Sequence, residues 1–427
     1  MEGDITVKRR DRYLAATILA AWAGVAVVIA ASVAPSWPGI IFGNGFASFW
    51  TAARIVLAGQ PSVLYDPNVQ LTWQHTLHSE LGLASRETRT GYDPFFYPPP
   101  FALVLLPLAS MPAPSAYLLW VALNFIFIVV AVTLPLKGMP QGMSRAAILI
   151  TFPAAAYDLL WGQVSGLLLL VLSLALVSMA SGQRTIGGML LGLLCIKPQC
   201  ALLFPLVFLL KRRWRELAGF SAVGLSMVGI SVVILGPEGV KLYLSHLGHA
   251  GGYYHPPDLS HSIKAYHMAN WRGLLMNLWP GISEAGGSIT VMALGAATVA
   301  ASLIVWRGKW DPCGPRFPRQ VLVLVLATLI SIPHSHFYGF TLVLAPLAFA
   351  LAKPMDRSPL ARSWRWILLA GYLLALLIWP LGLLWDGHPL QWLAVPYSLV
   401  LMGILIVQCR ADLTRESVNP QNTRSGT

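Results

Sequence analysis

The sequence predicts an all-α polytopic membrane protein, a bundle of about 10–13 transmembrane helices with re-entrant or broken helices and long outer loops. Of the 427 residues, 56% are hydrophobic and 11% are charged, whereas an ordinary soluble domain has about 25% charged residues. Apolar runs of about 20 residues match the ~30 Å hydrocarbon core of a bilayer, because a helix rises ~1.5 Å per residue. These runs do not alternate as the strands of a membrane β-barrel would.

Several apolar runs reach or approach a full span. They are residues 14–33, 114–136, 164–181, 217–235, 289–306, 367–384 and 390–408. Four shorter apolar segments contain or adjoin proline or glycine, namely 98–110, 146–160, 187–196 and 198–210. Helices that stop inside a membrane are tolerated where they are buried in protein or line a cavity. We therefore expect residues 146–160 to be re-entrant and a helix break at Lys197-Pro198.

This layout gathers polar residues on the outer face and predicts a cavity there. The expected cavity residues are Tyr97, Pro98, Trp161, Gln163, Gln199, His334 and His336. Residues 1–409 form a single integral membrane domain with outer loops at about 34–97 and 236–287, and the polar segment 410–427 is expected to be a disordered cytoplasmic tail. Within the first loop, residues 46–57 have an amphipathic pattern that predicts a helix lying in the membrane interface.

The net charge of +12 follows from topology. The basic residues cluster next to the ends of apolar runs, at 8–12, 211–215, 307–319 and 353–365. Short loops rich in lysine and arginine stay in the cytoplasm. The sequence therefore predicts a multi-pass protein of the cytoplasmic (inner) membrane, surrounded by its lipids, with both termini in the cytoplasm. Because the excess charge lies on one side, we expect no nucleic-acid partner.

Three cations are candidates for binding a phosphate. A lysine at mid-membrane costs about 3 kcal/mol, so Lys197 is a functional candidate that offers an ammonium as a compact charge. The alternative is a lysine at a helix end whose charged head reaches water. Arg54 and Arg272 lie near the outer interface and could hold an anionic head group, or could serve as interfacial anchors.

Two carboxylates in the outer loops are candidates for a catalytic base. Asp66 and Asp93 each lie in a Tyr-Asp-Pro triplet. A carboxylate with a raised pKa can accept the proton of an attacking hydroxyl, although Asp-Pro also favours a turn, and the sequence does not choose between the two aspartates. His334 and His336 could bind a metal, but no Asp or Cys accompanies them at ligand spacing. We therefore expect no metal site and no required cofactor, and hydrogen bonding to a sugar or phosphate fits these histidines equally well.

An ordered series of short motifs extends along the chain. It comprises ASFWTAAR at 47–54, LAGQP at 57–61, LYDP at 64–67, FYPPP at 96–100, PLA at 107–109, WGQ at 161–163, GLL at 192–194, KPQ at 197–199 and RRWR at 212–215. In this order the motifs resemble glycosyltransferase family 87, over roughly residues 40–350. The resemblance implies a GT-C-fold membrane enzyme that transfers a sugar, typically mannose, from a polyprenyl-phosphate donor to a lipid or glycan acceptor on the outer face. It also implies that Lys197 contacts the donor phosphate.

Two positions depart from the family pattern. Gly45 stands where the family has an acidic residue before the Phe of the first outer loop, and Gly339 stands where it has the Asp of a Tyr-Asp pair. Asp66, Asp93 or another outer carboxylate would then act as the base. Two alternatives remain: a non-catalytic relative that binds a lipid-linked sugar, and a transporter or flippase, which also has broken helices and an intramembrane lysine.

Overall fold

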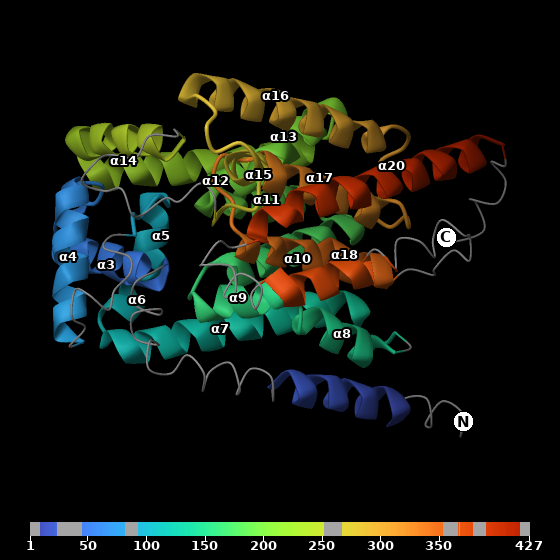
Figure 1. Ribbon diagram of the computed structural model, residues 1–427, viewed down its shortest axis with the longest axis horizontal. Helices are drawn as coiled ribbons and strands as arrows, with labels where there is room; N and C mark the ends of the chain where they lie inside the picture. The colour runs from blue at the N-terminus through green and yellow to red at the C-terminus, as the bar shows by residue number, and fades with distance from the viewer. Residues whose placement is uncertain are drawn as a thin grey trace.

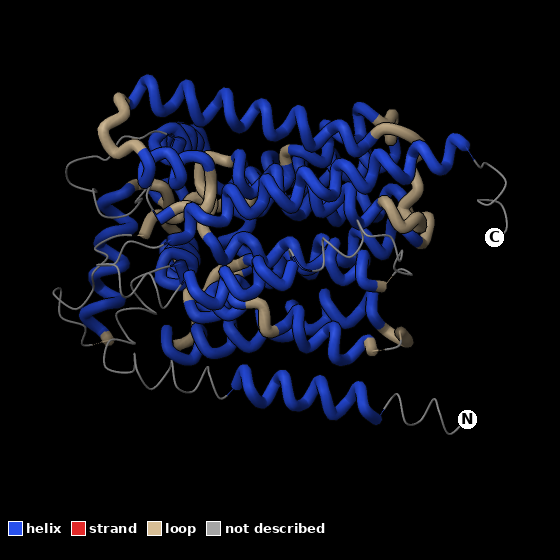
Figure 2. Tube along the Cα trace, turned by 45° about the vertical axis from the view of Figure 1, so that its right-hand side comes forward, coloured by secondary structure: helices blue, strands red, loops and turns tan. Residues whose placement is uncertain are grey.

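The computed structural model describes residues 9–23, 45–81, 93–139, 141–251, 267–352, 366, 368–378 and 390–418. Within these ranges the protein consists of helices joined by short turns and contains no strand (Figure 2). The prediction of an all-α protein is confirmed. The predicted span at 14–33 and the outer-loop segments 34–44, 82–92 and 252–266 lie partly or wholly outside the described residues.

Figure 1 shows the described helices in chain order, from blue near the N-terminus to red near the C-terminus. The α-helices are α3 (Gly45–Leu57), α4 (Pro67–Glu80), α5 (Pro99–Val104), α6 (Leu106–Ala109), α7 (Ala113–Thr133), α8 (Gly142–Ile150), α9 (Pro153–Leu160), α10 (Ser165–Ala180), α11 (Arg184–Leu193), α12 (Pro198–Ala201), α13 (Leu203–Leu210), α14 (Trp214–Gly251), α15 (Trp271–Leu278), α16 (Glu284–Leu303), α17 (Phe317–Ser331), α18 (Leu344–Leu351) and α20 (Ala394–Val418). Short 3-10 helices are η2 (Pro61–Val63), η3 (Leu134–Leu136), η4 (Leu194–Ile196), η6 (Ile304–Trp306), η7 (Phe337–Val343) and η8 (Leu390–Leu393).

Full-length membrane spans and shorter helices occur together. Among the described residues, four helices are long and apolar enough to cross a membrane: Ala113–Leu136, Trp214–Gly248, Ala285–Trp306 and Leu390–Thr414. The pair α8 and α9 is bent by 51° and would make a fifth. Other apolar helices have only 10–17 residues, and the chain breaks at Lys197-Pro198 between η4 and α12. A polytopic bundle with broken helices is thus confirmed, while the total of about 10–13 spans stays a prediction.

The two ends of the bundle differ in character. The long helices lie against one another in the pairs α7–α10, α10–α11, α16–α17 and α17–α20, and α3 to α6 gather at one end in Figure 1. At the other end the basic turns meet. Cys313 Sγ donates to the Ala180 carbonyl over 3.1 Å, and Arg319 pairs with Asp412 at 2.7 Å. The predicted basic turn at 307–319 therefore lies next to the C-terminal ends of α10 and α20.

Helix α3 is buried on all sides, so the prediction of an amphipathic helix with one exposed face is wrong, while its position relative to the membrane interface stays a prediction. Phe46, Phe49, Trp50 and Ile55 are all buried, although they point in different directions around the helix. The helix packs against α4, α5, α6 and α7, and these cover the face that the sequence pattern leaves to solvent. The burial fixes the N-terminal turn of α3, which contributes to the site described below.

The structure bears on two predicted boundaries. Helix α14 consists of two helical parts that meet at a kink, where Gly236 has the non-helical φ 65° and ψ 178° and Pro237 follows, so the predicted end of the apolar run at 235 coincides with this break. Positive φ suits glycine, and proline fits the first turn of a helix, so the pair ends one helical part and begins the next. Helix α20 extends to Val418, so the prediction of disorder is wrong for residues 410–418. Residues 419–427 lie outside the described residues.

Candidate active site

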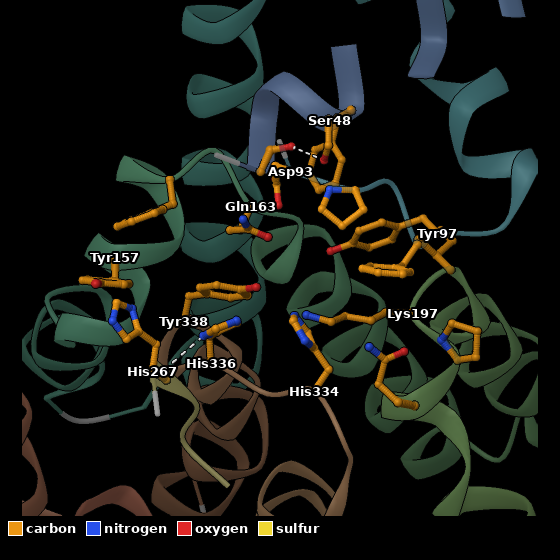
Figure 3. A pocket seen from close by; sticks show the side chains of 18 of the residues that line it. Ser48, Asp93, Tyr97, Tyr157, Gln163, Lys197, His267, His334, His336 and Tyr338 are labelled. Atoms are coloured by element: carbon orange, nitrogen blue, oxygen red, sulfur yellow. Dashed lines mark hydrogen bonds between the residues drawn. The ribbon is translucent and has the colours of Figure 1, made fainter. Parts of the chain in front are cut away.

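A cavity of about 200 Å³ lies between α3, α9, α12 and the loop that precedes η7. Its lining residues come from segments far apart in the sequence (Figure 3): Gly45, Ser48, Phe49, Asp93, Pro94, Phe96, Tyr97, Tyr157, Trp161, Gln163, Ile196, Lys197, Pro198, Gln199, His267, His334, His336, Tyr338 and Gln391. Six of the seven predicted cavity residues are among them. The exception is Pro98, which immediately precedes α5 and does not line the cavity.

The Asp93 carboxyl forms one end of the cavity. Two hydrogen bonds to the side chain of Gln74 on α4 hold the Asp93 backbone, one through its N–H (2.9 Å) and one through its carbonyl (2.7 Å). The carboxyl is hydrogen-bonded to the Ser48 side chain of α3 (Figure 3). Burial raises the pKa of Asp93 to about 7, although the bond to Ser48 acts to lower it. A carboxyl with this pKa can exchange a proton near neutral pH.

The Lys197 ammonium lies in another part of the cavity. Lys197 is the last residue before Pro198, where the helix breaks, and only 6% of it is exposed. Its Nζ lies 5.0 Å from the ring centroid of Tyr338. In Figure 3 the ammonium faces His334, away from Asp93. A buried cation without bulk water is a strong attractor for an anionic group of a ligand.

The turn that carries Gln163 is held from two sides. Asp158, at the end of α9, accepts hydrogen bonds from the backbone N–H groups of Ser165 (3.0 Å) and Gly166 (3.1 Å). The carboxylate thereby caps the N-terminus of α10, where unpaired N–H groups favour negative charge. Trp120 of α7 donates its indole N–H to the Gly162 carbonyl over 2.9 Å. The turn between α9 and α10 is therefore rigid where it meets the cavity.

Two neutral histidines line the cavity beside Lys197. His336 Nδ1 lies 3.2 Å from the His267 carbonyl oxygen, and burial lowers the pKa of His336 to about 4. Burial also lowers the pKa of His334 well below its ordinary value, with contributions from His336, Lys197 and Arg272. At neutral pH each imidazole can donate one hydrogen bond and accept one. Among the described residues, no three His, Cys, Asp or Glu side chains are grouped to hold a metal ion.

The sequence comparisons give this geometry a chemical context. Residues 95–332 match the family model of glycosyltransferase family 87. The chain belongs to glycosyltransferase family 87. It is therefore a membrane glycosyltransferase, and the enzyme class is hexosyltransferase. No solved structure matches the chain.

Two similar proteins are mycobacterial. The polyprenol-phosphate-mannose-dependent alpha-(1-2)-phosphatidylinositol pentamannoside mannosyltransferase of Mycolicibacterium smegmatis is 26% identical over 333 residues, which cover 73% of this chain and 76% of that protein. The protein of the same name from Mycobacterium tuberculosis is also 26% identical over 333 residues, covering 73% and 72%. Both thus align with most of this family 87 chain.

Three predicted site residues of this family 87 protein lie elsewhere. Asp66 caps α4, accepting from the backbone N–H groups of Asn68 (2.8 Å) and Val69 (3.4 Å), so it makes the turn that Asp-Pro favours. Arg54 donates to the Ala109 carbonyl over 3.3 Å and packs on tryptophan rings, as an anchor would. Arg272 is buried on α15 and does not line the cavity. Its positive charge helps to lower the pKa of His334, which does line the cavity.

The sequence interpretation of the family 87 site missed several lining residues. Ser48 lies within a quoted motif, and only the fold of α3 turns its hydroxyl toward Asp93. Tyr157 precedes Trp161 by one helical turn, and their rings stack at 5.5 Å; that spacing was an available signal. Gln391 comes from η8, and its side-chain oxygen accepts from the Phe337 N–H over 3.1 Å. No pattern in the sequence connects that remote segment to the cavity.

Proposed function

We propose that this protein transfers a hexosyl group, in particular mannose, from a polyprenyl-phosphate donor to a hydroxyl of a lipid or glycan acceptor on the outer face of the cytoplasmic membrane. The observation that carries the proposal is the pairing, in one cavity, of a buried carboxyl at Asp93 with a buried ammonium at Lys197. A sugar phosphate donor has an anionic leaving group and an acceptor hydroxyl needs a base. The two charged groups fit those two requirements, and the names of both relatives support the donor class.

Lys197 would bind the donor phosphate. The ammonium attracts the phosphate of the intact donor and stabilises it more strongly as it leaves with additional negative charge. His334, neutral and next to Lys197, would add a hydrogen bond. Because both residues lie at helix breaks, a lipid phosphate can approach them while its polyprenyl chain remains in the bilayer.

Asp93 would act as the general base. The acceptor oxygen forms a bond to the anomeric carbon, the bond from that carbon to the phosphate oxygen breaks, and polyprenyl phosphate leaves with the electron pair. The acceptor proton passes to the Asp93 carboxylate, and a single displacement inverts the anomeric centre. The reaction as written needs neither a metal nor a cofactor.

The proposed side of the membrane follows from the course of two helices. Helix α10 begins next to Gln163 in the cavity and ends next to the turn that carries Arg184. Helix α17 begins after Arg316 and ends just before His334. Both helices thus have the cavity at one end and the basic turns at the other. Basic turns stay in the cytoplasm, which supports an outer-facing cavity and cytoplasmic termini.

A transfer assay tests the proposal. The full-length protein is reconstituted in vesicles with polyprenyl-phosphate-[³H]mannose and a lipid extract of the host as the source of acceptors. Transfer of label to an extractable lipid or glycan, abolished by Asp93→Asn, is expected. Binding of the donor without transfer would indicate a non-catalytic binder and overturn the proposal, and movement of labelled donor between leaflets without transfer would indicate a flippase.

A further inference from the structure

We infer that Gln163 binds the attacking hydroxyl of the acceptor beside Asp93, and that it does so in space left free by the absence of a side chain at Gly45. The inference rests on the proposed function and names a further substrate-binding residue of the same site. In this role the Gln163 amide orients the acceptor hydroxyl, and the Asp93 carboxylate accepts the proton of that hydroxyl.

Gly45 and Gln163 compete for the same volume. A Cβ placed on Gly45 would lie 1.9 Å from Nε2 of Gln163 and 2.6 Å from its Cδ. Real Cβ atoms do not come so close to other heavy atoms, so any side chain at residue 45 would displace the amide. The end of Gln163 thus takes the position next to the first turn of α3 that a side chain of residue 45 would otherwise fill.

The backbone that carries Gln163 is fixed against α3. Gly162 has φ 56°, and a Cβ there would lie 2.7 Å from the Cβ of Phe46. Its lack of a side chain therefore permits both the turn and the close approach of α3. The Gln163 N–H donates to the Asp158 carbonyl over 2.9 Å. These two contacts fix the backbone position from which the Gln163 side chain extends into the cavity.

The Gln163 amide lacks a protein partner within the part of the chain that the structure describes. Only 6% of Gln163 is exposed, and the residue lines the cavity. The amide opens onto the cavity, so a substrate group there can hydrogen-bond to it. An amide both donates and accepts, which matches the hydrogen-bonding capacity of a hydroxyl.

Asp93 lies at the same end of the cavity as this amide. Ser48, one turn after Gly45 on α3, has one hydroxyl proton, which it can donate either to the Gly45 carbonyl 2.8 Å away or to the Asp93 carboxylate. Figure 3 shows Gln163 and Asp93 at this end, with Lys197 farther along the cavity. A hydroxyl placed there can donate its proton to the carboxylate while its oxygen accepts from the amide. Its free lone pair then faces the region in which a donor held by Lys197 would lie.

The test uses four full-length variants reconstituted as above, with polyprenyl-phosphate-[³H]mannose as the donor and the wild-type acceptor fraction. Gln163→Ala removes the amide and Gln163→Met keeps its approximate volume. Gly45→Asn displaces the amide, and Gly45→Asn with Gln163→Ala returns an amide to the same space from the other side. Initial rates are measured against both substrates, together with donor binding and thermal unfolding.

Both Gln163 variants are expected to lower kcat/KM for the acceptor by about 30-fold or more, as loss of a hydrogen bond to a buried polar group does. Donor binding should stay within about threefold of wild type, since the phosphate contacts are untouched. The Gly45→Asn/Gln163→Ala variant should recover most of the loss, which a merely structural role would not predict. Gln163→Met separates loss of the amide from loss of packing.

Three results would overturn the inference. They are wild-type acceptor kinetics in Gln163→Ala, an equal loss of donor binding, and no recovery in the double variant. If wild type transfers and Asp93→Asn does not, while Gln163→Ala matches wild type, the proposed function stands and the Gln163 inference alone fails. A wild-type protein that binds donor but transfers nothing would overturn both.

Discussion

The Lys197 ammonium lies over the ring of Tyr338, with Nζ 5.0 Å from the ring centroid. A cation over an aromatic face is stabilised by the ring quadrupole, and more so when water is excluded. Only 6% of Lys197 is exposed, so the contact orients the side chain before any ligand arrives. The same ring belongs to the segment that follows His336, so the contact joins two distant parts of the chain.

Replacing Lys197 with Ala is expected to weaken donor binding. The ammonium is the charged group that we assign to the phosphate, and hydrogen bonds to charged groups contribute about 1.5–3 kcal/mol. We expect kcat/KM for the donor to fall by at least about 10-fold, measured in reconstituted vesicles. Lys241→Ala is the matched control, since Lys241 is exposed and pairs with Glu238 at 2.8 Å. Unchanged donor kinetics in Lys197→Ala would exclude this assignment.

Asp93→Asn is expected to slow transfer strongly while leaving donor binding intact. General bases contribute about 10²–10⁴-fold to rates, so kcat should fall within that range. Asp66→Asn is the control with the same chemical change. Asp66 caps α4 through the Asn68 N–H at 2.8 Å, and an Asn can also cap. Its activity should stay within about threefold of wild type; a large loss in Asp66→Asn with none in Asp93→Asn would reverse the choice of base.

The pH profile should report Asp93. Its pKa is raised to about 7 by burial, and a base acts only when ionised. Activity should therefore fall tenfold per pH unit below about 7 and level off above it. Because the bond to Ser48 lowers the pKa, Ser48→Ala should move this acid limb to higher pH. An acid limb near pH 4 in the wild-type profile would contradict the role of Asp93 as the base. An acid limb at the same pH in Ser48→Ala and wild type would contradict the role of the Ser48–Asp93 hydrogen bond.

Gly162→Ala and Gly182→Ala should differ in severity. Both glycines have positive φ, 56° and 77°, which costs a residue with a side chain about 1–2 kcal/mol. A Cβ at Gly162 would also lie 2.7 Å from the Cβ of Phe46, whereas nothing lies within 4 Å of one at Gly182. Thermal unfolding should show a larger loss for Gly162→Ala, with reduced transfer, because the turn carrying Gln163 must shift. Equal losses of thermal stability in the two variants would contradict close packing of Gly162 against Phe46.

The helix break and the cavity residues around it were predictable because they are encoded locally. Pro198 interrupts an apolar run and Lys197 precedes it, so the break and the buried charge can be read from adjacent letters. Asp66 and Asp93 have the same local sequence, and only the fold separates them. One caps a helix, and the other is clamped by Gln74 at the cavity. Hydrogen-bond partners nineteen or more residues away leave no local pattern.

The sequence alone determined that this protein is a helical membrane protein of the glycosyltransferase type, with its cations grouped at helix ends. Run length, charge placement and motif order are properties of the chain itself, and the bilayer constrains the first two wherever the chain crosses it. Only the tertiary structure decided that Gln163 fills the space beside Gly45 and that Asp93, unlike Asp66, lines the same cavity as Lys197. Those relations depend on the close approach of α3 to the turn between α9 and α10, because packing brings distant segments within contact distance only when the whole bundle has formed.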